Sequence, residues 1–111
     1  MAIEDIKNWP TFLEQVRLRP SLWLGQCSLT ALQHQIYGIW LAEDIHRIPT
    51  KKRLGGFPWE EFEKWANDRF NPQRLSIRSF GMAHRMTNSD KEAFALWFEW
   101  YDQFHRDQEA E

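Results

Sequence analysis

The sequence has too few cysteines for a disulfide-linked protein and too few long apolar runs for a membrane protein. Its 111 residues include one cysteine, Cys27, so no intramolecular disulfide can form. It contains no run of about eighteen apolar residues, so it predicts no membrane-spanning helix. The first residues are charged and lack the apolar stretch of a signal peptide. Together these absences predict a cytoplasmic protein without a disulfide framework.

Patterns typical of catalysis or metal binding are also missing. The four histidines are scattered, without a His-x3-His pair, and Cys27 has no second cysteine at zinc-binding spacing. Cys27 and His34 lie close in sequence, but no third group is placed to orient them as nucleophile and base. Gly55-Gly56 lacks the Lys-Ser/Thr ending of a phosphate-binding loop, and the three glutamates of segment 60–63 have the spacing of a solvated helix face. The sequence therefore predicts no enzyme, no metal site and no cofactor.

Aromatic residues are abundant instead, with seven Trp, eight Phe and two Tyr. At about 150–250 Å² per ring, seventeen rings fit easily within the roughly 13,000 Å² that a chain of this mass buries on folding. The aromatic count alone therefore does not require an exposed binding surface. The length and the mixed composition predict one helical domain over residues 1–111.

Helical periodicity predicts an all-α, single-domain bundle of about five helices. The expected helices are 9–18, from 28 or 30 to about 48, 58–70, 74–85 and 89–104. Asn8 is the predicted N-cap of the first helix, and Ser89 with Glu92 forms a capping box before the last. The segment 74–86 also alternates like a strand, so both interpretations of it stay open.

Proline separates the first helix from the second. The Arg19-Pro20 pair predicts the end of the first helix, because the residue before a proline is pushed out of the helical region. We expect residues 21–27 to form a turn-rich connector. Trp23 and Leu24 would be its buried anchors.

Charge is unevenly distributed around a formal net charge of −2. Residues 1–46 contain three Lys or Arg and five Asp or Glu, residues 47–91 contain ten and five, and residues 92–111 contain one and six. Most of this charge is expected to pair internally or to face solvent. The remaining interpretation is that the acidic final helix and tail face a basic partner.

The order of several motifs resembles a group of small bacterial proteins. The residues that carry the resemblance are Arg19-Pro20-Ser-Leu-Trp23-Leu24-Gly25, Gly38, Phe57-x4-Phe62-x2-Trp65-x3-Arg69-Phe70 and Asp90-x-Glu-Ala-Phe94-x3-Phe98-x3-Asp102-x-Phe104. Many members of that group resemble immunity proteins of polymorphic or contact-delivered toxin systems. The similarity spans most of residues 12–104, although Trp23 stands where the group more often has tyrosine. The resemblance implies a helical immunity protein that binds a cognate toxin and blocks its active site or substrate entry. The absence of a catalytic pattern favours a non-enzymatic protein, and the acidic last helix favours a basic toxin.

The last helix supplies the expected contact residues. Its aromatic stripe is assigned to packing: Phe94, Trp97, Phe98, Tyr101 and Phe104. Glu99, Trp100 and Asp102 lie outside the strongest part of this stripe and are predicted to contact the toxin. Glu43 and Asp44 are added as further contacts, and the oligomeric state is left open.

A nucleic-acid-binding or regulatory adaptor is the alternative function. Lys51-Lys52-Arg53 and the arginines elsewhere in the 47–85 segment could contact phosphates. The negative net charge and the lack of a helix-turn-helix or RNA-binding signature count against this alternative.

Overall fold

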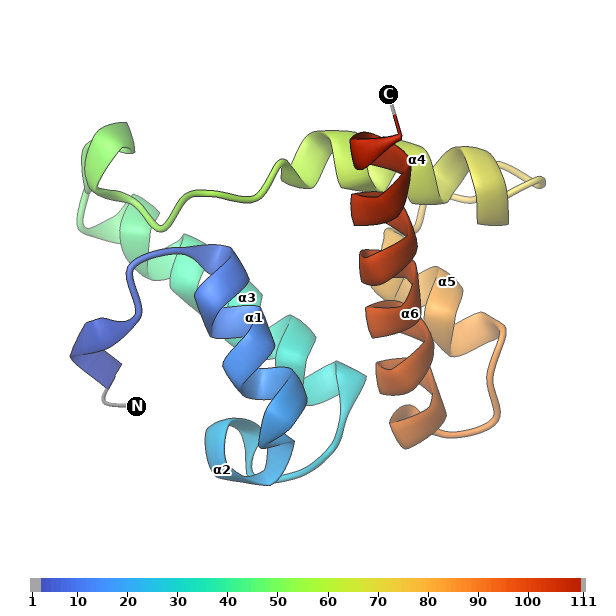
Figure 1. Ribbon diagram of the computed structural model, residues 1–111, viewed down its shortest axis with the longest axis horizontal. Coiled ribbons are helices and arrows are strands. Elements are labelled where there is room, and N and C mark those ends of the chain that lie inside the picture. The colour runs from blue at the N-terminus through green and yellow to red at the C-terminus, as the bar shows by residue number, and fades with distance from the viewer. Residues whose placement is uncertain (1–2, 111) are drawn as a thin grey trace. The chain divides into compact units, whose positions relative to one another are not determined.

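The computed structural model describes residues 3–110, and the regular elements within them are helical (Figure 1). The α-helices are α1 (Trp9–Leu18), α2 (Pro20–Leu24), α3 (Leu29–Ile45), α4 (Trp59–Phe70), α5 (Ser79–Arg85) and α6 (Asp90–Glu109). The 3-10 helices are η1 (Ile3–Asp5) and η2 (Thr50–Lys52). No strand occurs within the described residues, where Asn8 and Gly55 form an isolated bridge. The predicted all-α fold is confirmed.

The chain divides into two compact units, each built from two separate stretches of sequence. Unit 1 contains the residues up to Gln26 together with Ala31–Phe57, and so holds α1, α2 and most of α3. Unit 2 contains Cys27–Thr30 together with the residues from Pro58 onward, and so holds the start of α3 with α4, α5 and α6. The expectation of one domain over residues 1–111 stays a prediction.

In unit 1, α1 begins and ends where the local signals predict. The side-chain oxygen of Asn8 accepts the Thr11 N–H at 2.9 Å, so Asn8 is the N-cap. Arg19 ends the helix, as the following proline requires. The inner face of α1 is buried through Trp9, Phe12, Leu13 and Val16.

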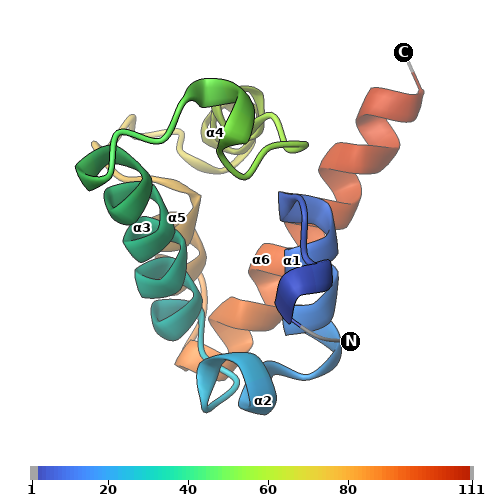
Figure 2. The same ribbon diagram turned by 90° about the vertical axis from the view of Figure 1, so that its left-hand side faces the viewer.

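The segment predicted as a connector instead forms α2, which lies next to the end of α1 in both views (Figures 1 and 2). Pro20 occupies its first position, where the missing N–H costs nothing and the fixed φ already suits a helix. Gly25 ends α2 in the left-handed region with φ of 82°. The expected anchors Trp23 and Leu24 are half-buried rather than buried.

The third helix, α3, is shorter than predicted because a left-handed residue ends it. Arg47 has φ of 51°, and its N–H donates to the Asp44 carbonyl at 3.1 Å. The Ile48 N–H donates to the Glu43 carbonyl at 2.9 Å. This pair of hydrogen bonds is a Schellman motif, in which the left-handed position is usually a glycine. The predicted extension to Ile48 is therefore wrong, and α3 stops at Ile45.

Aromatic rings from α4, α5 and α6 form the core of unit 2. Trp97 is fully buried, with Phe80 stacked on it at 5.4 Å between ring centroids and Phe62 edge-on at 5.5 Å. Phe104 meets Phe62 edge-on at 5.4 Å. Such pairs contribute about 0.5–1.5 kcal/mol each beyond their burial. The rings therefore join all three helices, and α5 lies against α6 (Figure 1).

The predicted fourth helix starts too early, because an asparagine side chain holds its first half in a loop. Asn71 donates from Nδ2 to the Leu75 carbonyl at 2.8 Å and accepts the Leu75 N–H on Oδ1 at 2.9 Å. Inside this loop Arg74 has φ of 53°, which a right-handed helix excludes. The Asn71 side chain thus pairs both backbone groups of Leu75, which need no helical partner. Helix α5 therefore begins only at Ser79.

The last helix, α6, begins at the predicted capping box with one difference. Ser89 Oγ accepts the Glu92 N–H at 3.1 Å, as expected for an N-cap. The Glu92 carboxylate accepts the Asn88 N–H at 3.2 Å, one residue before the N–H that the usual motif engages. The five aromatic residues that the sequence assigns to packing are all buried: Phe94, Trp97, Phe98, Tyr101 and Phe104.

Candidate functional site

The flank of α6 that the sequence assigns to a partner is only partly exposed. Glu99 is exposed and Asp102 is half-buried. Trp100 is only 2% exposed, and its ring stacks on Phe70 of α4 at 4.3 Å with 7° between the planes. The prediction of Trp100 as an exposed contact residue is therefore wrong. The buried face of α6 is wider than the aromatic stripe suggests, because α4 covers the adjoining side of the helix.

The two acidic residues predicted on α3 hold the basic loop that follows it. Glu43 accepts the Leu54 N–H at 2.7 Å. Asp44 accepts from Arg53 Nη1 at 2.6 Å, and Arg53 Nε donates to the Ile48 carbonyl at 2.8 Å. Both carboxylates thus bind groups of their own unit. Their role as toxin contacts stays a prediction, and they belong to a different unit from Glu99.

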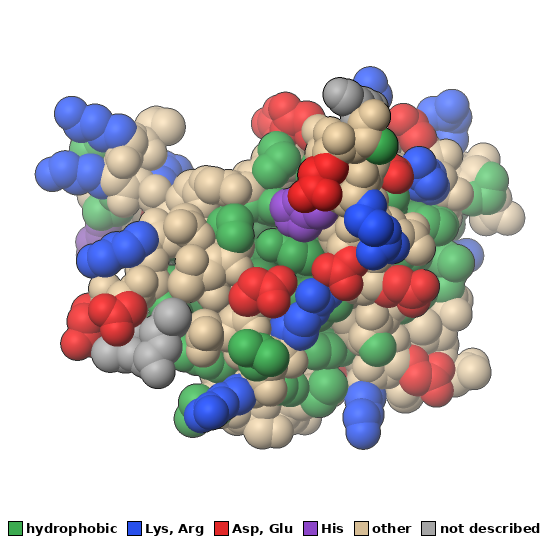
Figure 3. Space-filling model, in the orientation of Figure 1, with side chains coloured by type: hydrophobic (Ala, Val, Ile, Leu, Met, Phe, Trp, Pro, Cys, Tyr) green, Lys and Arg blue, Asp and Glu red, His purple; other side chains and the backbone are tan. Residues whose placement is uncertain are grey.

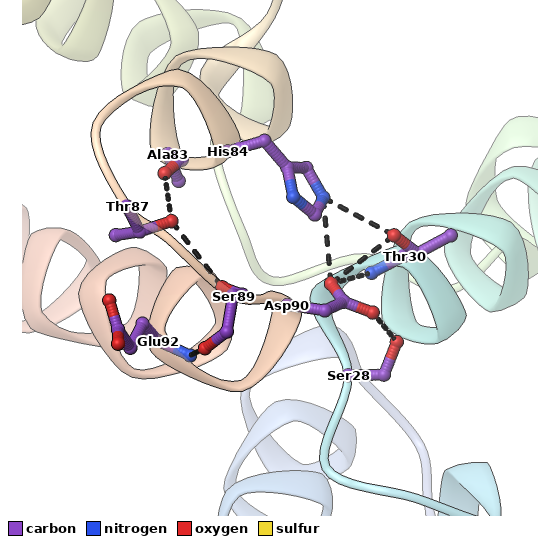
Figure 4. Close-up of polar contacts among 8 residues, drawn as sticks. All are labelled: Ser28, Thr30, Ala83, His84, Thr87, Ser89, Asp90 and Glu92. Carbon is purple, nitrogen blue, oxygen red and sulfur yellow. Dashed lines mark hydrogen bonds and ion pairs between the residues drawn. The ribbon is translucent and has the colours of Figure 1, made fainter.

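A polar cluster in unit 2 surrounds Asp90, the first residue of α6 (Figure 4). One carboxylate oxygen accepts the Ser28 hydroxyl in a short hydrogen bond. The other accepts the Thr30 N–H at 3.0 Å and the Thr30 hydroxyl at 3.2 Å. His84 Nε2 lies 3.6 Å from the same oxygen and 3.3 Å from Thr30 Oγ1. Asp90 therefore caps the free N–H of Thr30 at the start of α3, although the two residues are distant in sequence.

The charge of Asp90 is stabilised by this cluster. Burial alone would raise the pKa of the carboxyl group. The hydrogen bonds from Ser28 and Thr30 and the nearby His84 outweigh that effect, so the pKa of Asp90 lies below its ordinary value. The carboxylate is consequently ionised at neutral pH, in the form that accepts all of these hydrogen bonds.

The geometry of the Asp90 cluster is that of a helix cap and not of a catalytic relay. In a catalytic triad the carboxylate orients one ring nitrogen and the nucleophile faces the other. Here the same nitrogen of His84 faces both Thr30 and Asp90. The Ser28 hydroxyl donates to the carboxylate and is not activated by the imidazole. The cluster is therefore suited to joining segments of unit 2.

Replacing Asp90 by alanine is expected to lower the free energy of unfolding by about 1 kcal/mol at neutral pH, because Ser28 and Thr30 lose their acceptor. Partial exposure keeps the effect at this modest size. The folded pKa is below the unfolded value of about 3.9. The stabilisation is therefore complete above that pH and is lost as the pH falls through the lowered folded value.

Urea unfolding at neutral and acid pH measures this difference. The gap between wild type and Asp90→Ala should narrow in acid, whereas the exposed control Asp68→Ala should differ little from wild type at either pH. An unchanged gap at both pH values would contradict a role for the ionised carboxylate.

A second carboxylate, Glu63 on α4, fixes the start of α5. Its two oxygens accept the Ser79 N–H and the Ser79 hydroxyl, each at 2.8 Å. Ser79 Oγ in turn accepts the indole N–H of Trp97 at 2.9 Å. Both Ser79 and Trp97 are fully buried. Glu63 is therefore a structural partner in unit 2, and its assignment to a solvated helix face is wrong.

Two cations of the 47–85 segment are engaged within the protein. Arg53 is held by Asp44, as described above. Arg69 Nη2 pairs with Asp107 at 2.7 Å, and Arg69 Cζ lies over the Trp65 ring at 4.8 Å from its centroid. Trp65 Nε1 also donates to Asp107 at 2.8 Å. These two arginines are therefore less available to phosphates than the sequence implies.

A cavity of about 330 Å³ lies in unit 1. Its lining is apolar except for one glutamine: Ile3, Ile6, Phe12, Trp23, Gln35, Ile39 and Leu54. The indole N–H of Trp23 is buried and finds no hydrogen-bond partner among the described residues. Because this N–H is buried, it adds no exposed polar group to the lining of the cavity. The cavity is therefore suited to apolar groups and has few polar groups that could orient a ligand.

Residues 3–110 contain no group of three or more His, Cys, Asp or Glu side chains that could hold a metal ion. Cys27 is half-buried. None of the helices in that range is both long enough and apolar enough to cross a lipid bilayer. Comparison of the chain with protein-family models, with curated proteins and with solved structures gave no significant match.

Proposed function

We propose that the chain is an immunity protein that binds a cognate bacterial toxin and blocks its active site or substrate entry. The resemblance over residues 12–104 supports this function. The observation that supports it most directly in the structure is the exposed carboxylate of Glu99 on α6. The inner face of α6 is fixed by buried rings, so Glu99 is presented on a helix that is already ordered. Preordering lowers the entropic cost of binding.

The charge of this end of the chain indicates the kind of toxin. Residues 92–111 contain one basic and six acidic residues. Asp102 follows Glu99 by three positions, so the two side chains lie on neighbouring parts of one helix face. A negative surface of this kind speeds the encounter with a basic toxin and sets the orientation of the complex. With Trp100 buried, the expected contact is more electrostatic than aromatic.

The test is a charge reversal on α6 in a cell that also produces the candidate toxin, which we expect a neighbouring gene to encode. Glu99→Lys with Asp102→Lys should weaken the complex about tenfold or more, since each substitution places like charges against a basic surface. Growth of the co-expressing cells and the dissociation constant of the purified pair are the two measurements. Circular dichroism should show unchanged helix content.

A matched control has the same change of charge elsewhere in unit 2. Glu60 and Glu61 are exposed in the first turn of α4, and their double replacement by lysine should leave neutralisation intact. Equal loss in both double variants would show that net charge, and not the α6 flank, determines binding. Full neutralisation by the α6 variant would contradict this surface.

The ion pairs of the described residues reduce the support for the alternative of a nucleic-acid-binding or regulatory adaptor. Arg53 and Arg69 are engaged in ion pairs within their own units. A salt-dependent shift of DNA or RNA at micromolar protein would support the alternative, and no binding at low salt would remove it.

A further inference from the structure

Helix α3 has apolar side chains on two opposite faces. Leu32 and Ile36 are fully buried. Leu41 and Ile45 point away from that buried face and are 60% and 64% exposed. Gly38, three positions before Leu41, has open space where a Cβ would lie. Leu41 and Ile45 are one turn apart, so they form an exposed apolar patch on the face of α3 opposite its buried side, and contiguous exposed apolar patches mark interaction sites.

The residues Gly38, Leu41 and Ile45 are called the α3 stripe here. Their spacing of three and four positions places them in one row along the helix. Two large side chains stand beside a position with no side chain, which allows the backbone of a partner to come close. This shape suits the ridge of another helix.

Three exposed cations follow the α3 stripe directly along the chain, at Arg47, Lys51 and Lys52. In the described part of the chain none of the three takes part in an ion pair, whereas the neighbouring Arg53 is held by Asp44. Lys and Arg side chains gather over this loop at the upper left of the space-filling view (Figure 3). We call these three residues the basic loop. One surface of unit 1 thus has an apolar row that ends in free positive charge.

The backbone at Arg47 gives a separate reason to assign a role to the basic loop. Arg47 has φ of 51° at the left-handed position of the Schellman motif. Glycine adopts this conformation with far less strain. An arginine in this conformation lowers the free energy of unfolding relative to a glycine. Backbone strain of this kind is concentrated at binding sites. Its side chain adds a charge at the end of the α3 stripe.

We propose that the α3 stripe and the basic loop form a docking surface for an acidic amphipathic helix of another protein. The apolar row of that helix would pack on Leu41 and Ile45 and pass close to Gly38. Its carboxylates would meet the basic loop. The positive charge of the basic loop favours an acidic helix as the partner, because acidic side chains complement it. The same surface of a second copy of the chain would bring the same cations and repel them. The inference goes beyond the proposed toxin binding, which uses unit 2 and the opposite charge.

The proposal can be tested with the full chain and a synthetic probe. The probe is a fluorescent amphipathic peptide with leucine on one face and glutamate on the other, and its twin has lysine in place of glutamate. Fluorescence anisotropy at low salt should show micromolar binding of the glutamate peptide. The lysine peptide should bind at least about tenfold more weakly.

Substitutions on the α3 stripe should remove the apolar part of this binding. Leu41→Ser with Ile45→Ser is expected to weaken the glutamate peptide about tenfold or more, because two apolar contacts are lost. The matched control is Leu18→Ser with Leu22→Ser, which replaces leucines that are 70% and 69% exposed elsewhere in unit 1. The control should bind the peptide as the wild type does.

Substitutions in the basic loop should remove the charged part. Lys51→Glu with Lys52→Glu is expected to weaken binding about tenfold and to flatten its dependence on salt. Arg47→Gly should weaken binding while raising the melting temperature, because it removes the charge and the backbone strain together. A loss of binding caused by misfolding would instead lower the melting temperature.

Three outcomes would overturn the proposal. The first is equal binding of the glutamate and lysine peptides, and the second is equal weakening by the control pair at positions 18 and 22. The third is self-association of the wild type that Leu41→Ser with Ile45→Ser abolishes, with no binding of the glutamate peptide. That last result would assign the surface to a second copy of this chain.

Discussion

Replacing Trp100 by alanine is expected to lower the free energy of unfolding by about 3–5 kcal/mol. The side chain is 2% exposed and stacks closely on Phe70, so its loss leaves a large cavity between α4 and α6. A tryptophan on the surface would cost less than about 0.5 kcal/mol when replaced. Urea denaturation of the wild type and the variant measures this difference. If the free energy of unfolding depends on urea concentration equally steeply in both, a shift of the midpoint gives the stability lost at position 100.

Two controls accompany the Trp100 variant. Trp100→Phe keeps an aromatic ring against Phe70 and should cost about 1–2 kcal/mol, well below the alanine variant. Leu22→Ala, at a position that is 69% exposed, should change stability by less than about 0.5 kcal/mol. A loss below about 1 kcal/mol for Trp100→Ala would contradict the packing of α6 on α4.

Replacing Ser79 by alanine is expected to cost about 2–4 kcal/mol, which is large for the removal of one oxygen atom. The Ser79 hydroxyl both accepts the Trp97 N–H and donates to the Glu63 carboxylate. Without it, the indole N–H of a fully buried tryptophan has lost its acceptor. Thermal and urea unfolding should both show the loss.

A double-mutant cycle separates this cause from simple loss of packing. Trp97→Phe removes the N–H donor, so adding Ser79→Ala to it should cost clearly less than in the wild-type background. Ser76→Ala, at an exposed position, should be nearly neutral. Equal cost of Ser79→Ala in both backgrounds would show that the hydrogen bond to Trp97 contributes nothing to stability.

Local signals in the sequence were enough to place most of the helices. Asn8 and Ser89 cap the helices that follow them, because the caps involve residues only three positions away. Two of the helix boundaries that differ from the prediction depend on backbone conformations that the residue type allows but does not require. Pro20 can end one helix and also begin another, and Arg47 is an unusual residue in a left-handed position.

The candidate site was harder to predict, because its residues are defined by partners far along the chain. Trp100 lies at the edge of the aromatic stripe of α6, and its burial includes a ring stacked on it from α4, 30 positions earlier in the chain. Asp90 and Glu63 resemble ordinary acidic residues of a first turn or a solvated face. Their acceptor roles depend on groups 62 and 16 positions away, which no local pattern reveals.

The short segment Cys27–Thr30 has a consequence for how the protein is made. It belongs to unit 2, although the residues on either side of it belong to unit 1. Ser28 reaches its partner Asp90 across 62 positions of the chain. At a synthesis rate of roughly 5–20 residues per second, the segment waits about 3–12 s for that partner to leave the ribosome. Neither unit is a continuous stretch of the sequence, so unit 2 can be completed only after the residues of α6 have been synthesised.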